Sequence, residues 1–272
     1  MPVFADQHLH SSFSADSKAP MKDMIEAALS KGLKHISFTE HNDFEAPAYP
    51  EYPLGSWDLN VDSYLYELLG LREQYRDRLF IGFGIEIGLM EEAFRKNAVL
   101  AHSHEFDFVI GSVHFIGGLD IYDEKYFEGR DVKKALFDYF DAISKNITKF
   151  SNFDVLGHMD LPIRVMPWPE EDYKPSDHLD KIDEILNFLI ENEKGLELNM
   201  SSVIKGKKNP CPHPYILKRY RELGGELVTV GSDAHKPERV AGSFDLAADI
   251  LTDCGFKYYC TYENRTATYV KL

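Results

Sequence analysis

Histidine and acidic side chains recur along the chain, each directly after a short apolar run. They are His8 and His10, His41, Glu86, His114, His158, and Asp233 with His235. Imidazole and carboxylate groups are the protein ligands that zinc, iron and manganese accept. A buried imidazole or carboxylate without a partner costs several kcal/mol. A bound metal therefore explains the repeated pattern better than isolated structural residues do, and it indicates hydrolytic chemistry.

Two of these groups are pairs separated by a single residue. His8 and His10 lie two positions apart, as do Asp233 and His235. On a β-strand this spacing directs both side chains to the same face. Each pair is therefore predicted to bind one metal ion. The remaining histidines do not follow strand-like runs, and we expect structural roles for His35, His102, His104, His178 and His213.

The apolar runs that precede these residues have the length of strands, and longer amphipathic segments separate them. The predicted strands are residues 3–7, 35–39, 79–85, 106–113, 154–157, 195–198 and 227–231. Helical spacing of apolar residues marks 131–150 and 177–194 as crossover helices. This alternation predicts an α/β fold with a parallel sheet closed into a barrel. The strand C-termini of such a barrel form one rim, where residues distant in sequence meet.

Composition sets the class of protein. The chain has 272 residues, a formal net charge of −15 and no internal repeat or linker, so we expect a single domain over residues 1–272. No stretch approaches the roughly 18 apolar residues of a membrane span. The N-terminal segment lacks a secretory pattern, and Cys211, Cys254 and Cys260 are not paired in spacing. We therefore expect a cytoplasmic protein without a membrane or nucleic-acid partner; a homodimer stays open.

Six short motifs make the chain similar to a known family. They are Asp6-Gln7-His8-Leu9-His10, Thr39-Glu40-His41, Gly84-Ile85-Glu86, Gly111-Ser112-Val113-His114, Gly157-His158 and Gly231-Ser232-Asp233-Ala234-His235. Together they resemble the polymerase and histidinol phosphatase (PHP) family over almost the whole chain. Within that family, the length, the segment 8–16, and His158-Met159-Asp160 followed by Arg164 most resemble the monofunctional histidinol-phosphatases.

The resemblance implies a distorted (β/α)7 TIM-like barrel with a metal site at the C-terminal rim. It also implies three divalent metal ions, which the ligand types limit to zinc, iron or manganese. By matched position, the first ion would be bound by His8, His10, Glu86 and Asp233, the second by Glu86, His114 and His158, and the third by Asp16, His41 and His235. The implied reaction is hydrolysis of L-histidinol phosphate to L-histidinol and phosphate in histidine biosynthesis. A hydroxide that bridges two ions would attack phosphorus.

Several residues near the motifs are candidates for contacts to the substrate. Arg164 follows His158 in a loop above the rim, where a guanidinium can bind phosphate through two hydrogen bonds. Lys205, Arg239 and Asn199 are further predicted substrate contacts. Asp160 could protonate the leaving alcohol, and it could equally orient His158 or stabilise a turn; with Arg164 it is a candidate catalytic residue.

Two other functions compete with this prediction. A PHP-type phosphoesterase or exonuclease acting on another phosphate ester, such as a nucleotide, would need a channel rich in cations and aromatic side chains. The irregular segment 42–60 contains Tyr49, Tyr52 and Trp57, but its Glu45, Glu51 and Asp58 suit a cationic amine or imidazole better than a polyanion. The second alternative is a barrel that binds metals without catalysis, which the filled ligand set disfavours.

Overall fold

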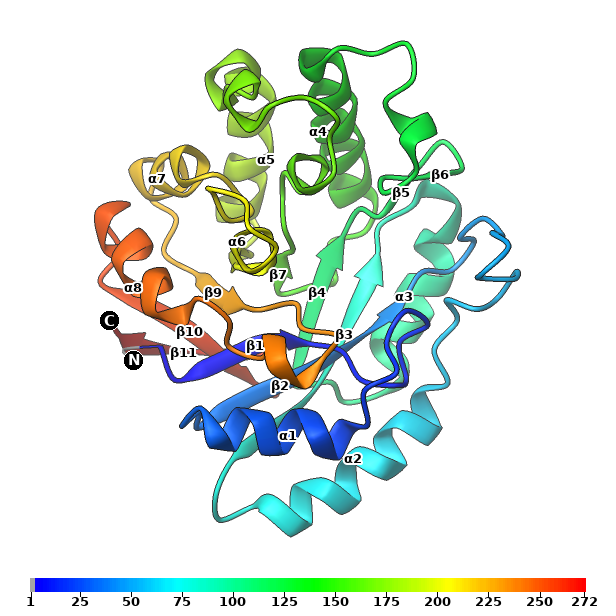
Figure 1. Ribbon diagram of the computed structural model, residues 1–272, viewed down its shortest axis with the longest axis vertical. Coiled ribbons are helices and arrows are strands. Elements are labelled where there is room, and N and C mark those ends of the chain that lie inside the picture. Colours follow the sequence, from blue (N-terminus) through cyan, green and yellow to red (C-terminus); the bar gives the residue numbers. More distant parts are fainter. Residues whose placement is uncertain (1–2) are drawn as a thin grey trace.

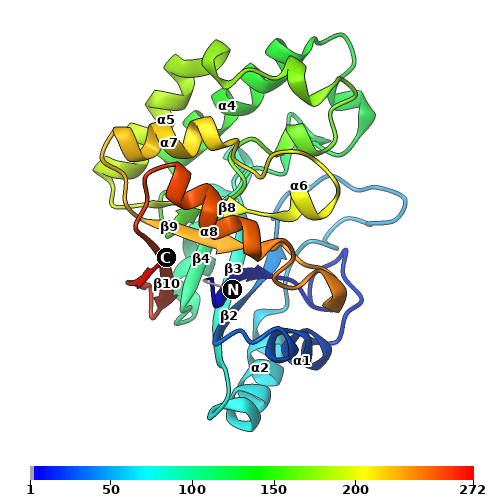
Figure 2. The same ribbon diagram turned by 60° about the vertical axis from the view of Figure 1, so that its left-hand side comes forward.

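Seven parallel strands form the centre of the molecule. The computed structural model describes residues 3–272. The strands pair in the order β1 (Ala5–Leu9), β2 (His35–Asn42), β3 (Phe80–Gly88), β4 (Phe108–Ser112), β7 (Val155–Leu156), β8 (Gly195–Asn199) and β9 (Val228–Gly231). All seven lie at the positions predicted from the apolar runs. Figure 1 shows them grouped inside a ring of helices, and Figure 2 shows helices on both sides of the strands.

The sheet closes into a barrel near the C-terminal ends of its first and last strands, β1 and β9. There the backbone N–H of His10 donates to the carbonyl of Ala234 at 3.0 Å, and the N–H of Asp233 donates to the carbonyl of His8 at 2.9 Å. Leu9 and Ala234 form an isolated parallel bridge between the first and last strands. The prediction of a distorted TIM-like barrel of seven βα units is therefore confirmed.

The helices cover the barrel with their apolar faces. They are α1 (Met21–Ser30), α2 (Val61–Tyr75), α3 (Phe94–Ser103), α4 (Val132–Lys149), α5 (Leu179–Glu191), α6 (Ser201–Ile204), α7 (Pro214–Glu222) and α8 (Phe244–Asp253). In α4 the predicted apolar positions Leu136, Phe140, Ile143 and Ile147 are all buried. Within the described range, no helix combines the length and the hydropathy needed to cross a membrane.

Short 3-10 helices and two hairpins complete the fold. The 3-10 helices are η1 (Glu91–Ala93), η2 (Glu124–Tyr126), η3 (Leu161–Arg164), η4 (Glu170–Asp172), η5 (Pro175–His178) and η6 (Pro237–Arg239). The first hairpin, β5 (Phe115–Ile116) and β6 (Leu119–Asp120), follows β4 at the rim. The second, β10 (Tyr258–Glu263) and β11 (Thr266–Lys271), forms the C-terminal tail.

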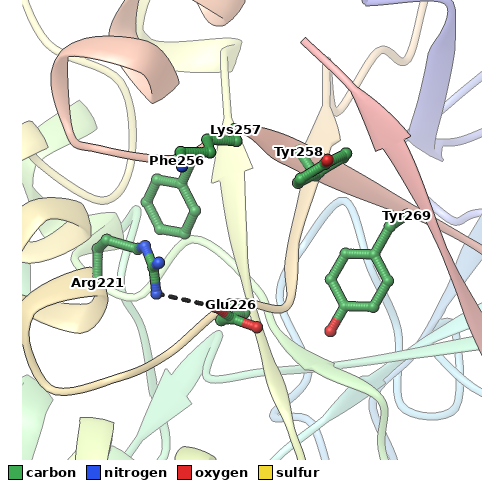
Figure 3. Close-up of a pocket in the computed structure, with 6 residues that line it drawn as sticks. All are labelled: Arg221, Glu226, Phe256, Lys257, Tyr258 and Tyr269. Carbon is green, nitrogen blue, oxygen red and sulfur yellow. Dashed lines mark ion pairs between the residues drawn. The ribbon is translucent and has the colours of Figure 1, made fainter.

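The tail hairpin packs against the barrel strands. The Tyr262 ring stacks on Phe108 with centroids 4.9 Å apart, and the Tyr262 N–H donates to Oε1 of Gln7 at 2.9 Å. A surface cavity of about 380 Å³ lies between this hairpin and α7 (Figure 3). Its Arg221 guanidinium pairs with Glu226 at 3.2 Å, two residues before β9 begins. The cavity is therefore at the N-terminal end of the barrel, away from the rim.

Asp107 joins several elements at this N-terminal end. Its Oδ2 accepts hydrogen bonds from the Phe83 N–H at 2.8 Å and from Nη2 of Arg72 at 2.6 Å. Its Oδ1 accepts from the Asn264 N–H at 3.1 Å. The side chain is 7% exposed. One carboxylate thus connects β3, α2 and the turn of the tail hairpin.

Asp107→Asn is expected to lower the free energy of unfolding by about 2 kcal/mol, because hydrogen bonds to a charged group contribute roughly 1.5–3 kcal/mol. An amide also presents a donor to one of the three N–H groups. Chemical denaturation measures the change, with Asp77→Ala as the control because the Asp77 side chain is 92% exposed. Equal stability of the two variants would contradict the role assigned to Asp107.

Candidate functional site

The side chains predicted as metal ligands meet at the C-terminal rim. Three of them, His8, His10 and Glu86, are fully buried at the bottom of the site. The other six line a cavity of about 380 Å³ directly above: Asp16, His41, His114, His158, Asp233 and His235. The structure therefore brings all nine predicted ligands together from the ends of β1, β2, β3, β4, β7 and β9 and the loop after β1.

Glu86 lies at the centre of this cluster. Its Oε2 is 3.3 Å from Nε2 of His8, 3.5 Å from Nε2 of His10 and 2.9 Å from Nδ1 of His41. Its Oε1 is 2.9 Å from Nε2 of His158 and 3.3 Å from Nε2 of His114. A carboxylate with imidazoles on both oxygens is placed to bridge two ions.

Three groups of ligand atoms are compact enough to hold a metal ion, with all atoms of a group within 4.8 Å of one another. They are His8, His10 and Asp233; His41, Glu86 and His114; and His10, His41 and His235. The first group lies within the set predicted for the first ion. The second group matches the set predicted for the second ion, except that His41 takes the place of His158. The third group matches the set predicted for the third ion, except that His10 takes the place of Asp16.

Asp16 and His158 lie at the edges of these groups. Oδ2 of Asp16 is 3.0 Å from Nε2 of His235, and Oδ1 is 3.8 Å from Nε2 of His41. His158 contacts Glu86 as described above. Both side chains are therefore close to the other members of the ligand sets that the family resemblance implies for them.

Hydrogen bonding alone does not account for this arrangement. Nε2 of His8 and Nε2 of His10 are 3.0 Å apart, so two ring nitrogens face each other. Among residues 3–272, Nδ1 of His158 has no hydrogen-bond partner. Oε2 of Glu86 and Nδ1 of His41 lie 2.9 Å apart, but their geometry does not form a hydrogen bond, and neither atom has another partner. Buried polar groups are normally paired, and each unpaired group carries a desolvation penalty. Nitrogen and oxygen atoms that converge in this way fit a divalent cation.

Four of the imidazoles use Nδ1 for a hydrogen bond and direct Nε2 toward the site. The acceptors are Glu197 Oε1 for His8 at 2.6 Å, Ser14 Oγ for His10 at 2.9 Å, Asp43 Oδ1 for His114 at 2.8 Å, and the Asp233 carbonyl for His235 at 3.1 Å. An acceptor at Nδ1 fixes the proton there and leaves the Nε2 lone pair free. This is the usual outer shell of a metal-bound histidine.

The charges of the cluster set the ionisation of its members. Burial alone would raise the pKa of Glu86, but the neighbouring His8, His114 and His41 outweigh it and hold that pKa well below its usual range. Burial and the neighbouring His41 and His235 lower the pKa of His10 well below its usual value. Glu86 is therefore anionic and His10 neutral, as metal binding requires. Neighbouring carboxylates outweigh burial and raise the pKa of His8, His41 and His114, so without metal these imidazoles carry the compensating positive charge, and a bound ion would displace their protons.

Four cationic side chains line the same cavity. Nη1 of Arg164 donates to Oδ2 of Asp233 at 2.7 Å, whereas its Nε and Nη2 have no hydrogen-bond partner within residues 3–272. The side chain is 3% exposed, so these two groups are held in place without protein acceptors. Lys205, Lys236 and Arg239 also line the cavity. These cations can bind a phosphoryl group in the cavity that the metal ligands line.

Two predicted substrate or catalytic residues lie outside the cavity wall. Asn199 is fully buried, and its Nδ2 donates to Glu197 and Asp233 beneath the site. Asp160 is also fully buried and accepts hydrogen bonds from the His213 N–H at 2.8 Å and the Tyr173 hydroxyl at 3.2 Å. Burial raises the Asp160 pKa to about 6. These contacts fit the turn-stabilising alternative for Asp160, which does not line the cavity. Protonation of the leaving group by Asp160 stays a prediction.

The segment 42–60 reaches the cavity through its aromatic residues. Tyr52 and Trp57 line the wall, together with Asp120 and Tyr122 from the β5–β6 region. The acidic residues of this segment do not line it, and Glu45 instead pairs with Lys96. Asp120 therefore supplies the acidic side chain that we expected from Glu45, Glu51 or Asp58. The five histidines given structural roles are absent from the lining.

Sequence reasoning missed Asp43, Glu197 and Asp120. Glu197 had one usable signal, since it is an ionisable residue within a short apolar strand. Asp43 follows His41 by two positions and repeats the spacing of the ligand pairs. Asp120 carried no signal, because its approach to the site depends on the β5–β6 hairpin.

Known proteins resemble the chain over nearly its full length. A probable histidinol-phosphatase of Clostridium acetobutylicum is 32% identical, with 93% of this chain and 94% of that protein covered. The histidinol-phosphatase of Lactococcus lactis is 31% identical, with 94% and 93% covered. A solved Lactococcus lactis histidinol phosphate phosphatase, in complex with zinc, L-histidinol and phosphate, superposes with a TM-score of 0.89. It is 29% identical, and the match covers 97% of this chain and 98% of that one.

A structure from Listeria monocytogenes superposes with a TM-score of 0.76 at 18% identity and shares the fold. The family model of the PHP domain matches residues 6–201, which include seven of the nine predicted metal ligands. Asp233 and His235 lie beyond the matched range but line the same cavity as the other predicted ligands. The match, the relatives and the convergence of the ligands at the rim lead to one conclusion: this chain belongs to the PHP domain family.

Proposed function

We propose that this protein is a metal-dependent phosphoric monoester hydrolase that converts L-histidinol phosphate to L-histidinol and phosphate. The observation that carries the proposal is the ligand cluster around Glu86 beside the unpaired N–H groups of Arg164. The relatives named histidinol-phosphatase, and the solved relative with zinc, L-histidinol and phosphate, support this substrate. By this activity the protein would act in histidine biosynthesis.

The ligand set would hold three divalent ions, drawn from zinc, iron and manganese. His8, His10, Glu86 and Asp233 form the first position; Glu86, His114 and His158 the second; Asp16, His41 and His235 the third. Bound ions supply Lewis acidity and lower the pKa of a coordinated water toward neutrality. Nitrogen and oxygen donors without cysteine suit these metals.

The protein's own cations would hold the phosphoryl group. Nε and Nη2 of Arg164 are free to donate two hydrogen bonds to its oxygens, while the contact from Nη1 to Asp233 keeps the guanidinium in place. Lys205 and Arg239 add positive charge at the same wall. Such groups stabilise the charge that develops on a transferring phosphoryl group.

Asp120 would select a cationic leaving group. One of its oxygens accepts from the Tyr122 N–H at 2.7 Å, and the carboxylate lines the cavity with Tyr52 and Trp57. A carboxylate and aromatic faces together suit the ammonium and imidazole groups of histidinol. They also disfavour a second phosphate, as a nucleotide or DNA end would present.

The alternative function is hydrolysis of another phosphate ester by the same ligand set. The protein carries a net charge of −15, which opposes binding of an extended polyanion. We therefore propose a small phosphorylated substrate and no nucleic-acid partner.

Phosphate release tests the proposed function. The metal-loaded protein is expected to hydrolyse histidinol phosphate in preference to sugar phosphates, nucleotides and single-stranded DNA, and a chelator should abolish the activity. A preference for another ester with the same chelator sensitivity would retain the metal-dependent reaction and reject histidinol phosphate. Activity that persists in the fully demetallated protein would reject both.

Substitution of two ligands tests the metal assignment. His158→Ala and Asp233→Asn are each expected to lower the number of bound ions and to reduce kcat by at least about 100-fold, because a water or a neutral amide is a weaker ligand than the side chain it replaces. Metal analysis of the purified variants gives the first readout. His102→Ala is the control, since His102 lies on α3 outside the site. Wild-type metal content and activity in either variant would exclude that residue as a ligand.

Asp120→Asn tests the selection of the leaving group. The variant is expected to lower kcat/KM for histidinol phosphate by about tenfold, which corresponds to roughly 1.4 kcal/mol for one charged contact. Hydrolysis of an ester with a neutral leaving group should be unchanged, because the metal ligands and Arg164 are intact. An equal loss of kcat/KM for both substrates would show that Asp120 does not select the leaving group.

A further inference from the structure

We propose that Glu197 is a positioning residue that sets the ligand geometry of the metal site from below. It would do so by holding the His8 imidazole and the backbone of His158 on one carboxylate. The inference rests on the metal-dependent function proposed above, and it assigns a role to a residue that is outside the three predicted ligand sets and does not line the cavity.

Glu197 joins three strands at the bottom of the site. It lies on β8, and its side chain is 1% exposed. Oε1 accepts from Nδ1 of His8 on β1 at 2.6 Å. Oε2 accepts from the His158 N–H, just after β7, at 2.9 Å, and from Nδ2 of Asn199 at 3.1 Å. Every donor around this carboxylate thus belongs to a metal-ligand residue or to the adjoining Asn199.

The contact to His8 determines which ring nitrogen can bind metal. A carboxylate at Nδ1 holds the proton on that nitrogen and leaves the lone pair on Nε2. Nε2 of His8 lies 3.3 Å from Oε2 of Glu86, where the first ion would bind. A carboxylate partner also makes the imidazole a stronger donor to the metal. Glu197 would therefore fix the orientation, tautomer and basicity of His8 together.

The contact to His158 extends this control to the second ion. The backbone of His158 is held by Glu197, and its Nε2 is 2.9 Å from Oε1 of Glu86. His8 and His158 approach opposite oxygens of the same bridging carboxylate. A displacement of Glu197 would therefore disturb both sides of Glu86.

The neighbouring strands leave room for this side chain. A Cβ on Gly231 would lie 2.4 Å from Oε1 of Glu197 and 2.5 Å from Cβ of His8. Both distances are too short for any side chain, so glycine is required where the last strand passes Glu197. The close approach explains why a glycine begins the motif that carries Asp233 and His235.

Glu197→Gln tests the proposal with little change in size. The amide offers one acceptor and one donor, so either Nδ1–H of His8 or the His158 N–H loses its acceptor. Competition with a chromophoric chelator is expected to show about 10–100-fold weaker zinc binding, the range typical of lost outer-shell partners. Asp107→Asn is the matched control, because it changes a buried carboxylate at the opposite end of the barrel. It should destabilise the fold and leave zinc affinity unchanged.

A double substitution separates positioning from general destabilisation. If Glu197 acts on the first ion through His8, Glu197→Gln should weaken that ion's binding less in the His8→Ala background than in the wild type. Wild-type zinc affinity in Glu197→Gln, or additive effects of the two substitutions, would overturn the proposal. The titration contains no phosphate ester, so failure of the proposed substrate leaves its result intact.

A measurement on the unsubstituted protein covers the case in which Glu197→Gln does not fold. Nitrogen-15 NMR of histidine-labelled, zinc-loaded protein should show the His8 ring protonated at Nδ1 and bound to metal through Nε2. The His8→Ala variant identifies the signal by its loss. Metal binding through Nδ1 would overturn the proposal.

Discussion

The structure depends on one electrostatic constraint, the burial of many ionisable groups around the Glu86 carboxylate. Glu86, His8 and His10 are fully buried, and His158 is 2% exposed. Groups of this kind are stable in a protein interior only when they are paired or bind metal. The parallel register places His41 beside Glu86 on the neighbouring strand, so the sheet itself brings ligands together. The strands thus fix the positions of the ligand side chains, and bound metal cations would supply the charge that compensates the buried carboxylates.

Closure of the barrel and assembly of the site are the same structural event. The hydrogen bonds that join the first and last strands come from His8, His10, Asp233 and Ala234, which are the ligand motifs themselves. Below the ligands, buried acceptors such as Glu197 and Asp43 fix the imidazole orientations. Above them, Arg164 and Asp120 face the cavity. The fold thus places three kinds of residue in successive layers: hydrogen-bond acceptors for the imidazoles, the predicted metal ligands, and the side chains proposed to contact the substrate.

Sequence reasoning predicted the barrel and the ligands because both have local signals. A short apolar run predicts a strand, and the residue after it lies at the rim, as His41 and His114 do. The groups around Nδ1 of each imidazole have no such signal, since Glu197 meets His8 across 189 residues of sequence. The role of Asp160 as an acid stays a prediction, and spacing does not reveal that Tyr173 and His213 donate hydrogen bonds to its carboxylate. The single domain, the homodimer and the cytoplasmic location stay predictions.

The central claim is that divalent cations bind between the ligand atoms around Glu86. Anomalous diffraction at the zinc edge, from crystals of the zinc-loaded protein, tests it most directly. The account predicts peaks bounded by the three predicted ligand sets, with metal–nitrogen distances of about 2.0–2.1 Å and Glu86 between two of the ions. Crystals with zinc bound only elsewhere, and with the imidazoles of the rim hydrogen-bonded to one another, would contradict it.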